Sequence, residues 1–344
     1  MKAHFKPYTL HFKRASGTSR GVLHTKETYF IVIQDNHKQG VGECNMFKGL
    51  SIDDRPDFLE KLQWACSNIS LGLDVLMLDL IEFPSIQFGL EQAFLSFNSQ
   101  HPYKLFQNDF TASKASIPIN GLIWMGTKEF MYQQIKEKLK TGFTTIKLKI
   151  GAIDFEAELE LLTFIRSEFN AEQIELRVDA NGAFLPATAL EKLKRLSEFE
   201  LHSIEQPIRQ GQWQEMADLC SRTPLPIALD EELIGVFSEV KKQLLLQTIC
   251  PQFIILKPAL VGGFKGSEGW ISMAKQQGID WWITSALESN IGLNAIAQWT
   301  FGLGNTMPQG LGTGALYTNN IECPLEVNNG ALSYSNNDNW NFKI

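Results

Sequence analysis

From residue 116 onwards, short apolar runs alternate regularly with longer amphipathic stretches. The runs have the length of strands, whereas stretches such as FEAELELLTFIRSEF have the apolar spacing of helices. The runs are SIPING, TTIKLKI, IELRVDA, HSIEQP, PIALDEE, FIILKP, DWWITSA and MPQGLG. Strand–helix units repeated in this way can close into a (β/α)8 barrel, and a doubly wound three-layer sheet is the alternative topology.

The preceding residues have a different pattern. Apolar and polar residues alternate from Tyr8 to Val41, with the clearest strand at TYFIVIQ (28–34) and a hairpin turn at NHKQG (36–40). Residues 55–73 and the segment FPSIQFGLEQAFLSF indicate two helices. We therefore predict an α+β domain over residues 1–115 and a barrel over 116–319. Residues 320–344 are expected to pack back on the first domain.

Composition excludes several classes of protein. The net charge of −7 gives no reason to expect nucleic-acid binding. The five cysteines are scattered without a CxxC pair, which argues against a disulfide framework and favours a reducing cytoplasm. The N-terminus is too basic and too poor in apolar residues for a signal peptide. No uncharged apolar run reaches the roughly 18 residues of a membrane span.

Charged residues stand where the central apolar runs end. The second strand ends at Lys149, and the next four end at Asp179, Glu205, Asp230 and Lys257, in successive steps of 30, 26, 25 and 27 residues. Each step is about one strand–helix unit. The C-terminal ends of barrel strands meet on one face, where barrel enzymes have their active sites. We therefore expect these five groups to meet in one mouth.

Three carboxylates and two lysines suit the removal of a proton next to a carboxylate. Carboxylate oxygens from separate strands suit Mg²⁺, with Mn²⁺ as a substitute, and the absence of His or Cys ligands argues against zinc. Such a cation stabilises the charge of an enediolate. Lys149 is the predicted base, because positive charge from Lys147 and the metal favours its neutral amine. A single Asp after a strand is more often a helix N-cap, but five aligned charges are not explained in that way.

The motifs resemble the enolase superfamily. TTIKLKIG, RVDANGAF, SIEQPI, IALDEEL, ILKPALVGG and SALESNIG follow the order of its barrel motifs, and the K-x-K at 147–149 with Lys257 resembles the muconate-lactonising subgroup. The segment GVGECNMFKGLS (40–51) is similar to the capping-domain loop that covers such sites. The resemblance covers nearly the whole chain and implies a modified TIM barrel with a capping domain. It implies Asp179, Glu205 and Asp230 as Mg²⁺ ligands, and Lys149 with Lys257 as catalytic residues.

Several reactions of this subgroup use the same side chains. Dipeptide epimerases usually carry Asp-x-Asp on strand eight, where this chain has QGLGTG. SIPINGLIW, PSIQFGLEQA and GLGTGALYTNN look like the o-succinylbenzoate synthases, hydro-lyases of menaquinone biosynthesis. That resemblance implies that Lys149 takes the α-proton and returns it to the leaving hydroxyl, while Lys257 is a fixed cation. N-acylamino acid racemases or other cycloisomerase-type enzymes are the alternative, and a non-catalytic anion-binding barrel is a third.

Further residues are predicted to support the site or contact a small carboxylate substrate. Asn181 belongs to the family's D-x-N, Ser285 is expected to meet the substrate, and Glu288 to lie in the outer shell of the metal or near the lysines. Backbone amides around Gly312 can bind a carboxylate, and Arg20 is a candidate lid residue. The complete set is Lys147, Asn181, Glu231, Ser285, Glu288, Gly312 and Arg20.

Overall fold

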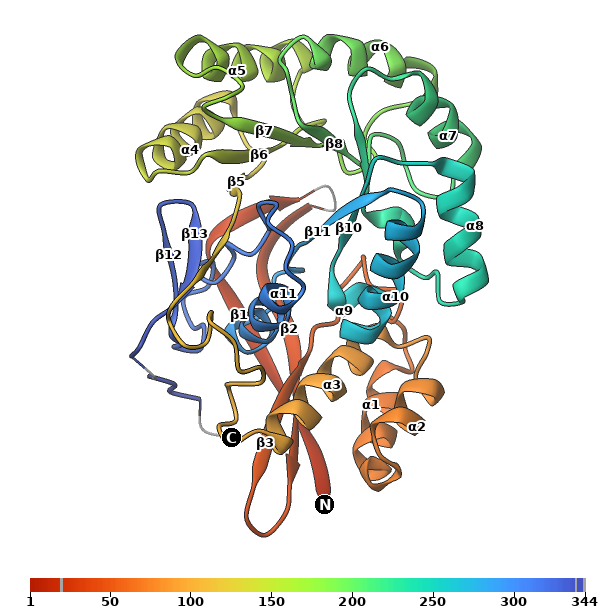
Figure 1. Cartoon of the computed structure of the whole chain (residues 1–344), viewed down its shortest axis with the longest axis vertical. Helices are drawn as coiled ribbons and strands as arrows, with labels where there is room; N and C mark the ends of the chain where they lie inside the picture. Colours follow the sequence, from red (N-terminus) through yellow and green to blue (C-terminus); the bar gives the residue numbers. More distant parts are fainter. Residues whose placement is uncertain (19–20, 338, 343–344) are drawn as a thin grey trace.

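The computed structural model describes residues 1–18, 21–337 and 339–342 of the chain (Figure 1). The N-terminal part is an antiparallel sheet in the order β1-β2-β3, covered by helices α1, α2 and α3. The bounds are β1 (Lys2–Thr18), β2 (Gly21–Gln34), β3 (Gln39–Cys44), α1 (Phe58–Ser67), the short η1 (Ile69–Leu71), α2 (Leu73–Asp79) and α3 (Pro84–Asn98). We call this part the cap.

Two local features of the cap follow directly from glycines. The single helix predicted over 55–73 is wrong, because α1 ends at Ser67 and the short η1 follows it. Gly72, with a φ of +82°, then separates η1 from α2. The second feature is the close packing of α3 on β3. A Cβ on Gly42 would overlap the carbonyl oxygen of Gly89 in α3, so this contact requires glycine. Helix α3 in turn contacts α9 (Pro258–Val261) and α10 (Gly263–Gln276), and so joins the cap to the barrel.

The second part is a seven-stranded parallel sheet in which strand order follows the sequence, β5 to β11, with helices between the strands (Figure 1). The strands are β5 (Gly121–Ile123), β6 (Thr145–Lys149), β7 (Glu175–Asp179), β8 (Ser203–Glu205), β9 (Ile227–Leu229), β10 (Phe253–Leu256) and β11 (Asp280–Ile283). The helices are α4 (Lys128–Lys140), α5 (Phe155–Glu168), α6 (Pro186–Ser197), α7 (Trp213–Arg222), α8 (Glu239–Ile249), α10 (Gly263–Gln276) and α11 (Asn290–Gly302). The short η2 (Glu231–Leu233) follows β9.

Two of the eight predicted barrel strands differ from the prediction. In SIPING, β4 (Ser116–Pro118) pairs with β13 (Ala331–Tyr334), which also pairs with β12 (Leu325–Asn328), and the first barrel strand is β5. MPQGLG meets its neighbours only at isolated bridges, Ile119 with Gln309 and Thr284 with Gly310. A proline lacks the N–H that a ladder needs and glycines weaken a strand, so Pro308 and Gly310 explain why the pairing is limited to Gln309 and Gly310.

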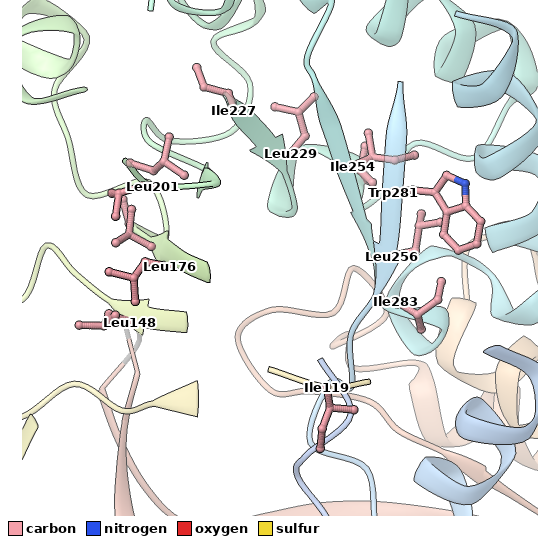
Figure 2. Close-up of a cluster of buried hydrophobic side chains, with 14 of the residues drawn as sticks. Ile119, Leu148, Leu176, Leu201, Ile227, Leu229, Ile254, Leu256, Trp281 and Ile283 are labelled. Carbon is pink, nitrogen blue, oxygen red and sulfur yellow. The ribbon is translucent and has the colours of Figure 1, made fainter. Parts of the chain in front are cut away.

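Alternation along the strands separates the core from the site. Apolar residues such as Leu148, Leu176, Leu229 and Leu256 are buried in one large cluster with the helices, and Figure 2 shows them on their strands. Successive strand residues point to opposite faces, so the polar residues between them face into the barrel. Beneath the site, the guanidinium of Arg177 lies 4.4 Å from the ring centroid of Trp282, which packs with Ala228 and Ile255.

The C-terminal segment returns to the cap. Trp340 stacks on Tyr103 with ring centroids 4.1 Å apart, and Phe342 lies 4.8 Å from Phe30 of β2. The predicted domain boundaries at 115/116 and 319/320 stay a prediction. Within the described residues, no helix is long and apolar enough to cross a membrane.

A buried carboxyl group of α3 makes stability depend on pH. Glu91 accepts hydrogen bonds from the backbone N–H groups of Phe264 (2.5 Å) and Lys265 (2.9 Å), and burial raises its pKa to about 7. The folded state therefore binds this proton more tightly than the unfolded chain. The resulting stabilisation is full below the ordinary pKa of 4.5 and is lost as the pH rises through the folded pKa.

We therefore expect the stability of the wild type to fall relative to that of Glu91→Gln between pH 5 and 8. The relative loss is at most about 3 kcal/mol, because each pKa unit corresponds to about 1.4 kcal/mol. Urea unfolding of both proteins at several pH values measures it. Parallel stability curves would show that Glu91 does not titrate in this range.

Candidate active site

A cavity of about 500 Å³ lies at the C-terminal ends of the barrel strands, between the barrel and the cap. Its wall includes Lys147, Lys149 and Asp179 from the strands, and Lys257, which directly follows β10. Phe47 of the cap also lines it. Of the five groups of the predicted mouth, Lys149, Asp179 and Lys257 line this cavity, whereas Glu205 and Asp230 are not among its lining residues.

Lys149 is the last residue of β6 and pairs in register with Asp179, the last residue of β7. Its half-buried amine lies 3.0 Å from Asp179 Oδ2 and donates a 2.7 Å hydrogen bond to Asn181 Oδ1. Asn181 has a φ of +43°, a conformation that Asn tolerates better than most residues, and its Nδ2 donates to Glu231 Oε1 at 3.1 Å. Three of the predicted site residues thus contact each other around the lysine that we predict as the base.

Lys147 lies two residues earlier on the same face of β6 and is buried more deeply. Its Nζ is 2.9 Å from Asp179 Oδ2 and also forms an ion pair with Glu205. Burial alone would lower the pKa of Lys147, but the carboxylates of Asp179 and Glu205 raise it well above its ordinary value. Against the opposite effect of burial, Lys147 and Lys149 hold the pKa of Asp179 well below its usual range. Lys147 is therefore a fixed cation.

Glu205 ends β8, and Asp230 and Lys257 directly follow β9 and β10. The amine of Lys257 forms an ion pair with Asp230 Oδ2. Burial, together with the charges of Asp179 and Asp230, raises the pKa of Glu205 to about 8. Glu205 Oε1 is buried and receives no hydrogen bond from any residue that the structure describes. One oxygen of the acid cluster is therefore left without a donor among the described residues.

The arrangement of these acidic side chains can be compared with the predicted metal site. Across the described part of the chain, no group of three acidic, His or Cys side chains is arranged to hold a metal ion. The amines of Lys147, Lys149 and Lys257 instead contact the carboxylates. The donor set itself fits Mg²⁺, since it offers carboxylate oxygens and includes the buried oxygen of Glu205 that lacks a donor.

The remaining predicted residues are less directly connected to the acids. Ser285 and Gly312 line the cavity. Glu288 is fully buried and accepts hydrogen bonds from Ser285, Ala286 and Asn45, and in the described structure none comes from the lysines of the barrel mouth. Arg20 lies outside the described residues.

The cavity also includes residues that the motifs did not single out. Phe47 and Leu50 fall within 40–51, the segment similar to a capping loop, so that resemblance was a usable signal. Trp124, Thr313 and Lys13 also line the cavity. Trp124 and Thr313 lie in SIPINGLIW and GLGTGALYTNN, two segments already noted for their resemblance to the synthases. The sequence context of Lys13 gives no warning, because Lys13 reaches the site only through the way that the cap docks on the barrel.

Comparison with known proteins first defines the class. Residues 131–337 match the family model described as "Enolase C-terminal domain-like", which is more than half of the chain. The structure superposes on the muconate lactonizing enzyme of Pseudomonas fluorescens with a TM-score of 0.81, over 96% of this chain and 93% of that chain, at 20% sequence identity. The chain belongs to the enolase superfamily and has its fold.

A full-length relative then narrows the assignment. The chain is 48% identical to an o-succinylbenzoate synthase of Desulfotalea psychrophila, over 97% of this chain and 99% of the relative. It also superposes on the crystal structure of MenC from that organism with a TM-score of 0.85, at 43% identity, covering 97% and 99% of the two chains. The chain belongs to the o-succinylbenzoate synthase family of the enolase superfamily.

Proposed function

We propose that this protein is an o-succinylbenzoate synthase. It removes water from 2-succinyl-6-hydroxy-2,4-cyclohexadiene-1-carboxylate to give 2-succinylbenzoate in menaquinone biosynthesis. The observation that carries the proposal is the position of Lys149, which faces the cavity beside Asp179 and Asn181, in a chain with a full-length synthase relative. The small carboxylate substrate is its expected partner.

Lys149 Nζ takes the proton from the ring carbon that carries the carboxylate, and the electron pair of the C–H bond moves into the carboxylate as an enediolate. The same amine then returns its proton to the hydroxyl group on the same face of the ring. The C–O bond breaks, water leaves and the ring becomes aromatic, so no oxidant is needed. Lys257, held in its ion pair with Asp230, stabilises the negative charge as a fixed cation.

Asp179, Glu205 and Asp230 are the residues that we propose to hold Mg²⁺. When bound, the cation supplies charge stabilisation for the substrate carboxylate. A dipeptide epimerase of Enterococcus faecalis, which shares this fold at 18% identity, has been crystallised as a complex with Mg and a dipeptide. The buried oxygen of Glu205 and the raised pKa of that carboxyl group support a cation at this place.

The strand-eight side of the cavity argues against epimerisation of dipeptides. Gly310, Gly312 and Thr313 line the cavity there, and residues 309–316 contain no carboxylate that could hold the ammonium group of a dipeptide. The role of Lys257 distinguishes the synthase from an N-acylamino acid racemase. In a racemase Lys257 would exchange protons with the substrate, whereas in the synthase it remains a fixed cation.

An absorbance assay tests the function. Purified protein with Mg²⁺ and the cyclohexadiene carboxylate is expected to form the aromatic product, followed by its ultraviolet absorbance. The same preparation is incubated with N-succinyl amino acids in deuterated buffer. Absence of the aromatic product, together with rapid racemisation and deuterium incorporation, would identify a racemase instead.

The five cysteines Cys44, Cys66, Cys220, Cys250 and Cys323 form no disulfide in the structure. Free thiols are typical of a reducing compartment. We therefore place the enzyme in the cytoplasm.

A further inference from the structure

The loop of residues 285–289, between β11 and α11, carries part of the cavity wall. We call it the strand-seven loop, because β11 is the seventh strand of the barrel sheet. Ser285, Ala286 and Leu287 line the cavity. Leu287 has a φ of +62°, a conformation that is uncommon for a leucine, so other contacts must hold the loop in this shape. One such contact is the hydroxyl of Tyr317, which donates to the Leu287 carbonyl at 2.7 Å.

Other contacts come from the cap. Asn45, which directly follows β3, donates from Nδ2 to the Ala286 carbonyl at 2.9 Å and to Glu288 Oε1 at 3.0 Å. Its Oδ1 accepts from the amine of Lys26 in β2, which is itself buried. Since an ammonium group can only donate, Lys26 fixes which end of the Asn45 amide faces the loop. The Nδ2 end of the buried Asn45 amide therefore faces the strand-seven loop.

From Asn45 the hydrogen bonds continue to the cavity. Glu288 accepts from Asn45, and its Oε2 also accepts from Ser285 Oγ at 2.5 Å. Ser285 Oγ in turn accepts from Thr313 Oγ1 at 2.8 Å and from the Leu287 N–H at 3.0 Å. Each hydroxyl has a single proton, so this chain fixes where the Ser285 and Thr313 protons point. The cap therefore determines which atoms of this part of the cavity wall donate hydrogen bonds and which accept them. This part of the wall lies across the barrel from the acids.

We infer that Asn45, oriented by Lys26, is a positioning residue that holds the strand-seven loop in the shape that binds the substrate portion distant from the acid cluster. This inference rests on the proposed function. Asn45 lies outside the cavity lining that the structure describes, and it acts only through Ala286 and Glu288. Its loss should therefore weaken substrate binding much more than the chemical step at Lys149.

The test compares Asn45→Leu with Ser96→Ala in the Mg²⁺-loaded enzyme. Ser96 is a matched control, because it is buried in the cap and joins the Val41 N–H to the Pro102 carbonyl, away from the loop. We expect Asn45→Leu to raise KM for the cyclohexadiene carboxylate about tenfold or more while kcat changes less than about threefold, as expected for a lost buried hydrogen bond. Ser96→Ala should leave both constants near the wild-type values.

A second variant keeps the test decisive if Asn45→Leu does not fold. Asn45→Asp has the same shape and still accepts from Lys26, but it cannot donate to Ala286 or Glu288, so it should show the same rise in KM. Hydrogen exchange should be faster over residues 285–289 in both Asn45 variants and unchanged there in Ser96→Ala. An unchanged KM in a folded Asn45 variant, or an equal rise in Ser96→Ala, overturns the inference. An inactive wild type counts against the proposed function instead.

Discussion

Replacement of Lys149 by alanine is expected to abolish formation of the aromatic product while leaving the fold intact. One positioned acid or base typically contributes a factor of about 10² to 10⁴ in rate. Lys149 acts twice in the proposed reaction, first as base and then as acid, so the loss should reach about 10⁴ or more. Its amine is half-buried at the end of β6, and truncation there leaves the apolar core on the opposite face untouched. Absorbance kinetics and circular dichroism measure the two effects.

The control for this variant is Lys140→Ala. Lys140 is the exposed last residue of α4, and its replacement should leave turnover and fold unchanged. Titration with the stable product, 2-succinylbenzoate, separates binding from chemistry, because the Lys149 variant should still bind it. A Lys149→Ala enzyme that kept a tenth of wild-type turnover would exclude Lys149 as the base.

Removal of the cation is expected to produce the second large effect. EDTA should abolish turnover, and added Mg²⁺ or Mn²⁺ should restore it. Asp179→Asn should lower kcat at least about 10²- to 10³-fold even at saturating Mg²⁺, since loss of one charge-stabilising group costs that much in other enzymes. Kinetics across a range of Mg²⁺ concentrations would also show a raised metal requirement.

Asp218→Asn is the matched control for the carboxylate variant. Asp218 is exposed on α7 and pairs only with Arg222 in the described structure, so its replacement should not change the metal requirement. Full activity in EDTA, or an Asp179→Asn enzyme with wild-type kinetics, would show that the reaction does not depend on Mg²⁺ held by Asp179.

The positions of the charged side chains were predictable from the sequence for a simple physical reason. Parallel strands joined by helices bring their C-terminal ends to one face, so residues about 25–30 apart become neighbours. The alternation of strand side chains also predicts that Lys147 and Lys149 share a face. Both lysines contact Asp179.

What the sequence did not predict depends on tertiary contacts. Nothing in the sequence near Asn45 indicates that its amide reaches Ala286, because the contact joins residues 241 positions apart. That Ser285 meets the substrate stays a prediction, and the sequence did not indicate that its hydroxyl donates to Glu288 and accepts from Thr313. The weak pairing of MPQGLG is different, because its proline and glycines, which oppose regular strand pairing, are visible in the sequence.

A crystal structure of the enzyme with Mn²⁺ and 2-succinylbenzoate, with the metal located by its anomalous scattering, would test the proposed metal site and the role of Lys149 together. We expect one metal ion that takes an oxygen from each of Asp179, Glu205 and Asp230, with the amine of Lys149 facing the product ring carbon that carries the carboxylate. A metal held elsewhere, or a product bound with that carbon turned away from Lys149, would contradict this expectation.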